Sequence, residues 1–223
     1  MLATMLASGM SEIKAQKTEY YNTKHEVGVT IGAGATTEIF SGLTDFTSLL
    51  IEATVSTVMT GGTYTGYHKY GDEKYIPNLS VEYYYHVNKI IGLGGFLAFN
   101  GMDRDIYAEL KNNTNDTKSM SKIGKATRRN FSLIPTAKID WLRTKNFGMY
   151  TKGGIGVSFL FEKQKDDASD DGADFEETSD TTVIPNVQFS LLGMEGGLEN
   201  LRLFAEFGFG EQGIVLAGLK YKF

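Results

Sequence analysis

Titratable side chains recur on one side of the strand-like segments of this 223-residue chain. Ten of them occupy even-numbered positions: Glu26, Glu82, His86, Lys138, Asp140, Lys152, Arg202, Glu206, Lys220 and Lys222. Acidic and basic groups compensate one another, so ion pairing is the simplest chemistry they could perform. Charges removed from water are stable only when they are paired. We therefore predict a structural ion-pair network, in preference to a proton relay or a conduction path.

A hydrolytic site would need a nucleophile held beside a base and an acid, typically serine, histidine and a carboxylate. The chain has only three histidines, at positions 25, 68 and 86. His68 has no obvious serine and acid beside it, and His86 shares a face with Glu82, four residues away, as an ion pair would. The sequence thus predicts no catalytic residues, no cofactor and no enzymatic activity.

An acidic segment, residues 163–181, partly matches the spacing of a calcium-binding loop at Asp167, Ser169, Asp171 and Gly172. The twelfth position of that loop should be a bidentate glutamate, but it is Thr178. We favour a solvated flexible loop over weak divalent-cation binding, and assign no metal site.

The composition excludes several classes of protein. With no cysteine and a net charge of −5, the chain is neither a disulfide-stapled scaffold, nor a thiolate metal site, nor a strongly basic nucleic-acid binder. It has no run of eighteen apolar residues, so a helical membrane span is excluded as well. A membrane barrel stays possible, because only alternate residues of its strands face lipid.

Alternating apolar and polar residues, rich in aromatic and β-branched types, predict eight strands from residue 24 onward. They cover about 25–35, 75–87, 90–101, 128–142, 148–162, 182–194, 200–210 and 213–223. We expect long loops at 36–74, 102–127 and 163–181, and short connections elsewhere. In an antiparallel meander every other connection lies at the same end, so one end carries the long loops. This asymmetry is typical of outer-membrane barrels.

The two faces of these strands differ in composition. The odd-numbered face carries residues such as Val29, Leu133 and Val157, and none of its members is charged. The even-numbered face carries the ten titratable residues together with many glycines. This composition suits the crowded interior of an eight-stranded barrel. Aromatic residues gather near both ends of the odd face, as two interfacial girdles do.

The final segment, GIVLAGLKYKF, alternates back from a terminal aromatic, Phe223, through Tyr221. It resembles the signal by which the outer-membrane assembly machinery recognises its barrels. With the eight strands, residues 24–223 resemble a small outer-membrane β-barrel domain protein of the OmpA/OmpX-like kind. The resemblance implies an eight-stranded antiparallel up-and-down transmembrane β-barrel in the cell outer membrane, with both termini in the periplasm. Residues 1–23 would be a signal-peptide remnant or an N-terminal tail.

The implied partners are outer-membrane lipid, lipopolysaccharide and the assembly machinery. We expect no nucleic-acid partner and a monomeric protein, and the external partner is unknown. We expect a plugged lumen and surface loops with an interaction or structural role. Two alternatives remain open: a narrow pore or transporter of small hydrophobic ligands, and a soluble lipocalin-like carrier with its apolar face inward.

Two local expectations complete the prediction. Inside the barrel, Glu206 should lie near Arg202 and Lys220, and Glu26 should close against Lys220 and Lys222. In the first loop, residues 44–62 could form a short amphipathic helix, but the β-branched run 54–58 argues against a long one.

Overall fold

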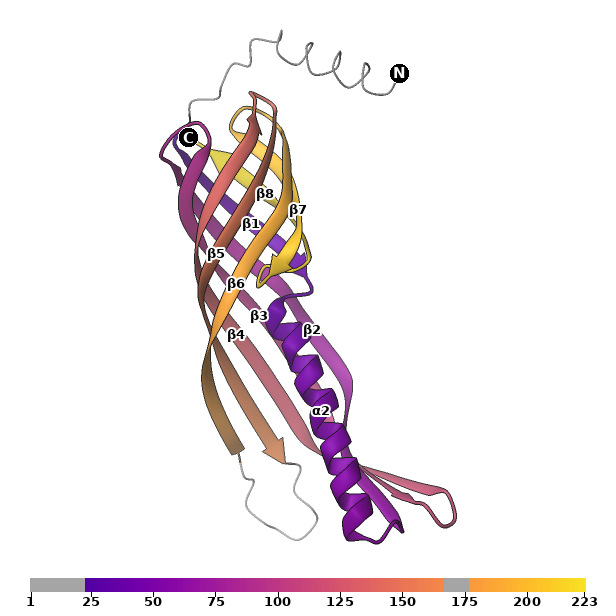
Figure 1. Cartoon of the computed structure of the whole chain (residues 1–223). Coiled ribbons are helices and arrows are strands. Elements are labelled where there is room, and N and C mark those ends of the chain that lie inside the picture. Colours follow the sequence, from indigo (N-terminus) through magenta and orange to yellow (C-terminus); the bar gives the residue numbers. More distant parts are fainter. Residues whose placement is uncertain (1–22, 167–176) are drawn as a thin grey trace, which may run out of the picture.

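A computed structural model describes residues 23–166 and 177–223. Its elements, in chain order, are β1 (His25–Ala33), α2 (Thr36–Met59), β2 (Tyr64–His86), β3 (Ile91–Asn112), β4 (Thr117–Arg143), β5 (Phe147–Asp166), β6 (Glu177–Gly197), β7 (Leu201–Gly210) and β8 (Val215–Lys222). Each strand pairs antiparallel with the next, and β8 pairs with β1, so the ring closes (Figure 1). The predicted all-β class and the order of the eight strands are therefore confirmed.

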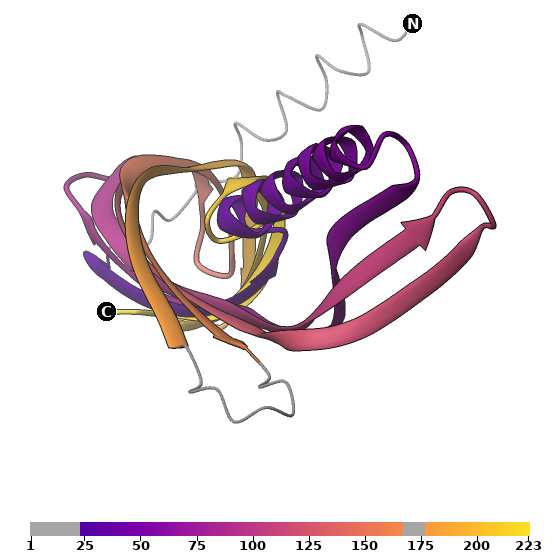
Figure 2. The same ribbon diagram turned by 90° about the horizontal axis from the view of Figure 1, so that it is seen from below.

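The strands are of two lengths, which divides the molecule into two levels. β1, β7 and β8 span 8–10 residues, whereas β2 to β6 span 20–27. At the end with the short turns all eight strands form a closed barrel. Beyond the tips of β1, β7 and β8, the sheet continues as an open trough made of β2 to β6 (Figures 1 and 2).

The predicted long loops are largely wrong. Residues 64–74 belong to β2, and most of 102–127 forms paired extensions of β3 and β4, from Met102↔Arg128 to Asn112↔Thr117. Outward residues of this extension, such as Asp103 and Lys125, are polar, so no apolar alternation marks it in the sequence. In the third predicted loop, β5 runs to Asp166 and β6 begins at Glu177.

The helix in the first loop is also longer than predicted, because α2 spans 24 residues. Its threonine hydroxyls donate to carbonyls one turn earlier, as from Thr54 to Leu50 O at 2.7 Å. Contacts with β2 compensate for the low helix propensity of the β-branched residues in α2. Ser56 Oγ accepts from Gly66 N and donates to Gly66 O, both at 2.8 Å, and Glu52 Oε2 accepts from His68 N at 2.7 Å. These bonds satisfy an edge of β2 that no strand covers there.

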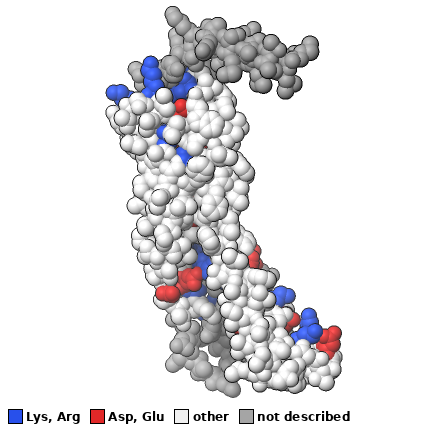
Figure 3. Space-filling view, viewed as in Figure 1, with Lys and Arg blue, Asp and Glu red and all other residues white. Residues whose placement is uncertain are grey.

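The burial pattern confirms the predicted phase of the two faces. Val29, Leu133 and Val157 point outward and expose 52%, 51% and 37% of their surface, whereas the ten titratable residues point inward and are buried. On the face drawn in Figure 3, charged side chains gather toward the two ends of the molecule and leave a broad uncharged band between them. The closed part of the barrel is thus apolar outside and charged inside.

Candidate functional site

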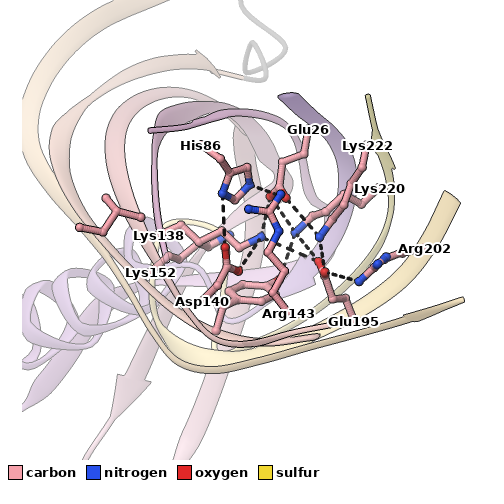
Figure 4. A network of polar contacts seen from close by, with 12 residues as sticks. Glu26, His86, Lys138, Asp140, Arg143, Lys152, Glu195, Arg202, Lys220 and Lys222 are labelled. Atoms are coloured by element: carbon pink, nitrogen blue, oxygen red, sulfur yellow. Dashed lines mark hydrogen bonds and ion pairs between the residues drawn. The ribbon is translucent and has the colours of Figure 1, made fainter. Parts of the chain in front are cut away.

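A network of ion pairs fills the lumen of the closed barrel (Figure 4). Glu26 Oε1 lies 2.7 Å from Lys138 Nζ and 3.2 Å from Lys220 Nζ, and its Oε2 lies 3.6 Å from Lys222 Nζ. The register of β1 with β8 creates this cluster, because it places Glu26 opposite Lys222 and residue 28 opposite Lys220. The structure therefore brings Glu26, Lys220 and Lys222 together as the sequence predicts.

Arg202 pairs with a residue that the sequence analysis missed. Its Nη1 donates to Glu195 Oε1 at 2.7 Å, whereas the Glu206 expected beside it pairs with Lys152. Glu195 also contacts Lys222, and its Oε2 lies 3.5 Å from Lys220 Nζ. A β-bulge between Ser190 and Leu192 explains the omission, since it moves the odd-numbered residues that follow to the inner face.

Glu206 belongs to a second cluster that lies farther from the short turns. Lys152 Nζ lies 2.8 Å from both Glu206 Oε1 and Glu82 Oε2. Tyr150 and Ser190 donate to the two oxygens of Glu206 at 2.7 and 2.6 Å. All these side chains are buried, so the carboxylate oxygens that pair with Lys152 are shielded from water.

His86 contacts Glu26 and Asp140, not Glu82 as the spacing suggested. Its Nε2 lies 3.1 Å from Glu26 Oε2 and its Nδ1 lies 3.3 Å from Asp140 Oδ2. Asp140 Oδ1 lies 3.6 Å from Lys138 Nζ. All ten titratable residues of the even-numbered face thus take part in ion pairs in the lumen, although His86 does not meet Glu82 as the spacing suggested.

Aromatic rings occupy the space between the charges. Lys138 Nζ lies 4.0 Å from the ring centroid of Tyr150, and Lys220 Nζ lies 4.2 Å from that of Phe204. Backbones also approach closely: a Cβ at Gly156 would lie 2.1 Å from the carbonyl oxygen of Leu133. The lumen is therefore filled by side chains, and glycine is required where the wall leaves no room.

A fully buried carboxylate closes the other end of the closed barrel. Glu211, in the turn between β7 and β8, points inward and is 0% exposed. Its Oε1 accepts from Thr37 Oγ1 and Asn100 Nδ2, both at 2.9 Å, and also from Asn130. Its Oε2 accepts from Asn186 Nδ2 at 2.7 Å. These donors come from α2, β3, β4 and β6, so a single side chain joins the base of the helix to the barrel wall.

Residues 211–212 fall in one of the short connections expected between the predicted strands 200–210 and 213–223. Gln212 also points inward, where its N–H donates to Gln188 Oε1 at 2.9 Å and its Nε2 to Ser80 Oγ at 2.7 Å. A polar pair in a two-residue turn looks solvent-exposed in sequence. Only the recurrence of asparagine near the rim, at positions 78, 100, 130 and 186, could have indicated buried polar partners.

A second polar region lies between α2 and the trough. There Arg104 donates from Nη2 to Asp45 Oδ1 at 3.0 Å, and its Cζ lies 3.5 Å from the ring centroid of Tyr70, on which the guanidinium stacks. Burial alone would lower the pKa of Arg104, but hydrogen bonds and the charge of Asp45 raise it above its ordinary value. At the rim of this region a hydrogen bond to Glu73 raises the pKa of Tyr75 to about 12. Both residues keep their protons at physiological pH, and the Arg104–Asp45 pair is a permanent link between helix and sheet.

The other sequence candidates gain no catalytic support. His68 Nδ1 lies 3.0 Å from Glu52 Oε2, but the nearby Ser56 hydroxyl is bonded to the backbone of Gly66. The calcium-like positions Asp167, Ser169, Asp171 and Gly172 lie outside the described residues. Within the described residues, no group of three or more His, Asp or Glu side chains is arranged to hold a metal, and no helix is long and apolar enough to cross a membrane.

The sequence matches no protein-family model and no curated protein.

Proposed function

We propose that this protein is an outer-membrane β-barrel with a plugged lumen that carries a helix-covered trough on the cell surface for an interaction or structural role, without enzymatic activity. The observation that carries the proposal is the inverted distribution of polarity in the closed barrel. A water-soluble protein places charges outside and apolar groups inside, whereas this barrel buries its charges and exposes its apolar side chains. A lipid environment is the solvent in which that distribution is stable.

The height of the apolar band supports the same proposal. On β3, the segment from Ile91 at the short turn to Phe99 has nine residues, which is about what a tilted strand needs to cross a bilayer. Aromatic clusters bound the band. Phe99 and Phe131 lie 4.8 Å apart at one end, and His25 and Phe223 stack at 5.3 Å at the other. Rings at these two levels would lie at the lipid headgroups.

The alternatives fit less well. A soluble lipocalin-like carrier would keep its apolar face inward, but that face points outward here. A pore would need an open path, whereas Lys138, Lys152, Glu82 and Glu206 are almost completely buried in the lumen. Stepwise conductance across a planar bilayer would favour the pore and contradict the plugged barrel.

Single-cysteine labelling tests the location and the orientation together, because the chain has no cysteine of its own. Asn115→Cys lies in the turn between β3 and β4, at the tip of the trough, and Lys145→Cys lies in the short turn between β4 and β5. We expect a membrane-impermeant maleimide to label position 115 in intact cells, and position 145 only after the outer membrane is permeabilised. Equal labelling of both positions in intact cells, or fractionation with the soluble proteins, would contradict the proposal.

A further inference from the structure

Two adjoining cavities, with volumes of about 190 and 260 Å³, lie in the trough between α2 and the inner face of the extended sheet. Asp45, Tyr70, Met102 and Arg128 line both of them. Thr37 and Asn100, which line the first cavity, both donate to Glu211, so the plug bounds this space on the side of the closed barrel. The helix α2 covers the side that the strands leave open (Figure 2). The cavities therefore belong to one space between α2, the plug and the sheet. Together they are large enough for a small organic molecule.

Arg128 distinguishes this space from an ordinary polar groove. It lies on β4, next to Met102 of β3 and Glu162 of β5 in the sheet register. Its Nε lies 2.5 Å from Glu162 Oε1, while its Nη1 is buried and has no hydrogen-bond partner among the described residues. A buried guanidinium nitrogen without an acceptor is costly, and a carboxylate or phosphate oxygen would satisfy it.

The other charged groups that line the first cavity already have partners. Asp45 is paired with Arg104, Glu73 accepts from the Tyr75 hydroxyl, and Glu38 Oε2 accepts from Ala35 N at 3.3 Å. The acidic side chains are thus engaged within the protein, whereas Arg128 keeps a donor to offer. This difference favours an anionic ligand over a cationic one.

The rest of the lining suits an apolar body. Met102 and the rings of Tyr70 and Tyr75 contribute apolar surface on the sheet side. On the helix side, a Cβ placed at Gly42 would meet no atom within 4 Å, so the helix leaves space there. An ion such as inorganic phosphate would leave this apolar surface unused.

We propose that the space under α2 binds a small organic anion, in which a carboxylate or phosphate group accepts from Arg128 Nη1 and an apolar body lies against Met102, Tyr70 and Tyr75. This site goes beyond the proposed membrane role and does not depend on it, since the cavity is formed by the fold alone.

Equilibrium dialysis of the detergent-free protein in amphipol tests the proposal with four probes that share one apolar body: naphthoate, naphthyl phosphate, naphthylmethylammonium and naphthylmethanol. We expect saturable binding of at least one of the two anions and much weaker binding of the cation and the alcohol. Comparison of naphthoate with naphthyl phosphate shows which acidic group the site prefers. The absence of anion binding up to millimolar concentration, or equal binding of all four probes, would overturn the proposal.

Adjacent arginines on opposite faces of β4 provide a matched pair of variants. Arg128→Gln should weaken anion binding on the order of tenfold or more, because a hydrogen bond to a charged group is lost. Arg129→Gln should leave binding unchanged, because Arg129 points outward and pairs with Asp103 at 2.8 Å. Heat-modifiability on gels would confirm that both variants are folded. Equal affinity in the two folded variants would contradict the role of Arg128, whatever the cysteine labelling shows about membrane location.

Discussion

The hydroxyl of Thr37 donates to the carboxylate of Glu211 at 2.9 Å, which ties the first turn of α2 to the turn between β7 and β8. The same carboxylate accepts from three asparagine side chains of the barrel wall. A carboxylate is tolerable in such a buried place because several oriented donors replace its water. This one carboxylate therefore links the wall of the barrel to the first turn of the helix.

Glu211→Ala should destabilise the protein by about 3 kcal/mol or more, because it leaves several buried donors without an acceptor. It should also loosen the base of α2, which hydrogen exchange of residues 36–45 would report. Glu73→Ala is the control, since that carboxylate is exposed and accepts from the hydroxyl of the nearby Tyr75. Unchanged exchange of α2 in Glu211→Ala would contradict the role assigned to this carboxylate.

Glu195→Ala should cost about 3–5 kcal/mol, because it leaves Arg202 and Lys222 buried with one carboxylate fewer. The exposed pair of Lys145 and Glu199, 3.4 Å apart, provides the comparison, and Glu199→Ala should cost at most about 1 kcal/mol. Urea unfolding of both variants in the same detergent measures the difference. Equal midpoints would mean that water reaches the lumen charges.

Val157→Arg should cost roughly 2–4 kcal/mol, because Val157 lies in the middle of the outward apolar band. Met120→Arg introduces the same charge at an exposed position near the tip of β4 and should cost little. Folding into lipid vesicles followed by denaturant titration would compare the two. Similar small effects would indicate that the band faces water.

Gly156→Ala should destabilise the barrel by about 1–3 kcal/mol, because its Cβ would overlap the backbone of the neighbouring strand. Gly153→Ala tests the same strand where the nearest atom, of Phe189, is 3.6 Å away, an ordinary contact. Thermal unfolding in detergent should separate these variants clearly. Equal stability of Gly156→Ala and Gly153→Ala would contradict the close approach of the two strands at Gly156.

On the proposed function, deletion of Phe223 should lower the amount of barrel that reaches the outer membrane. Phe223 and Tyr221 resemble an assembly signal, and the ring of Phe223 also stacks on His25. Phe209→Ala, at the opposite end of the band, removes an outward aromatic without changing the terminus. Heat-modifiable protein in membrane fractions measures the outcome, and normal amounts after deletion of Phe223 would contradict the assembly role.

Much of the closed barrel could be predicted from the sequence alone. Side-chain direction in a strand alternates with every residue, so the uncharged face of Val29, Leu133 and Val157 and the charged face of Glu26 and Lys220 follow from local order. Eight such segments set the number of strands. The signal is local and strong because an apolar residue on the wrong face would be costly at every position.

The tertiary structure decided what depends on contacts between distant segments. The bulge near Leu191 turns Glu195 inward, and only the pairing of β6 with its neighbours reveals it. The polar extensions of β3 and β4 carry no apolar alternation, and α2 is stabilised by the edge of β2 against its β-branched composition. Glu211 has the sequence surroundings of an exposed turn. Its carboxylate is buried and hydrogen-bonded only because closure of the barrel brings donors from three strands and a helix to one point. These donors lie far apart in the sequence, so no local pattern indicates the site.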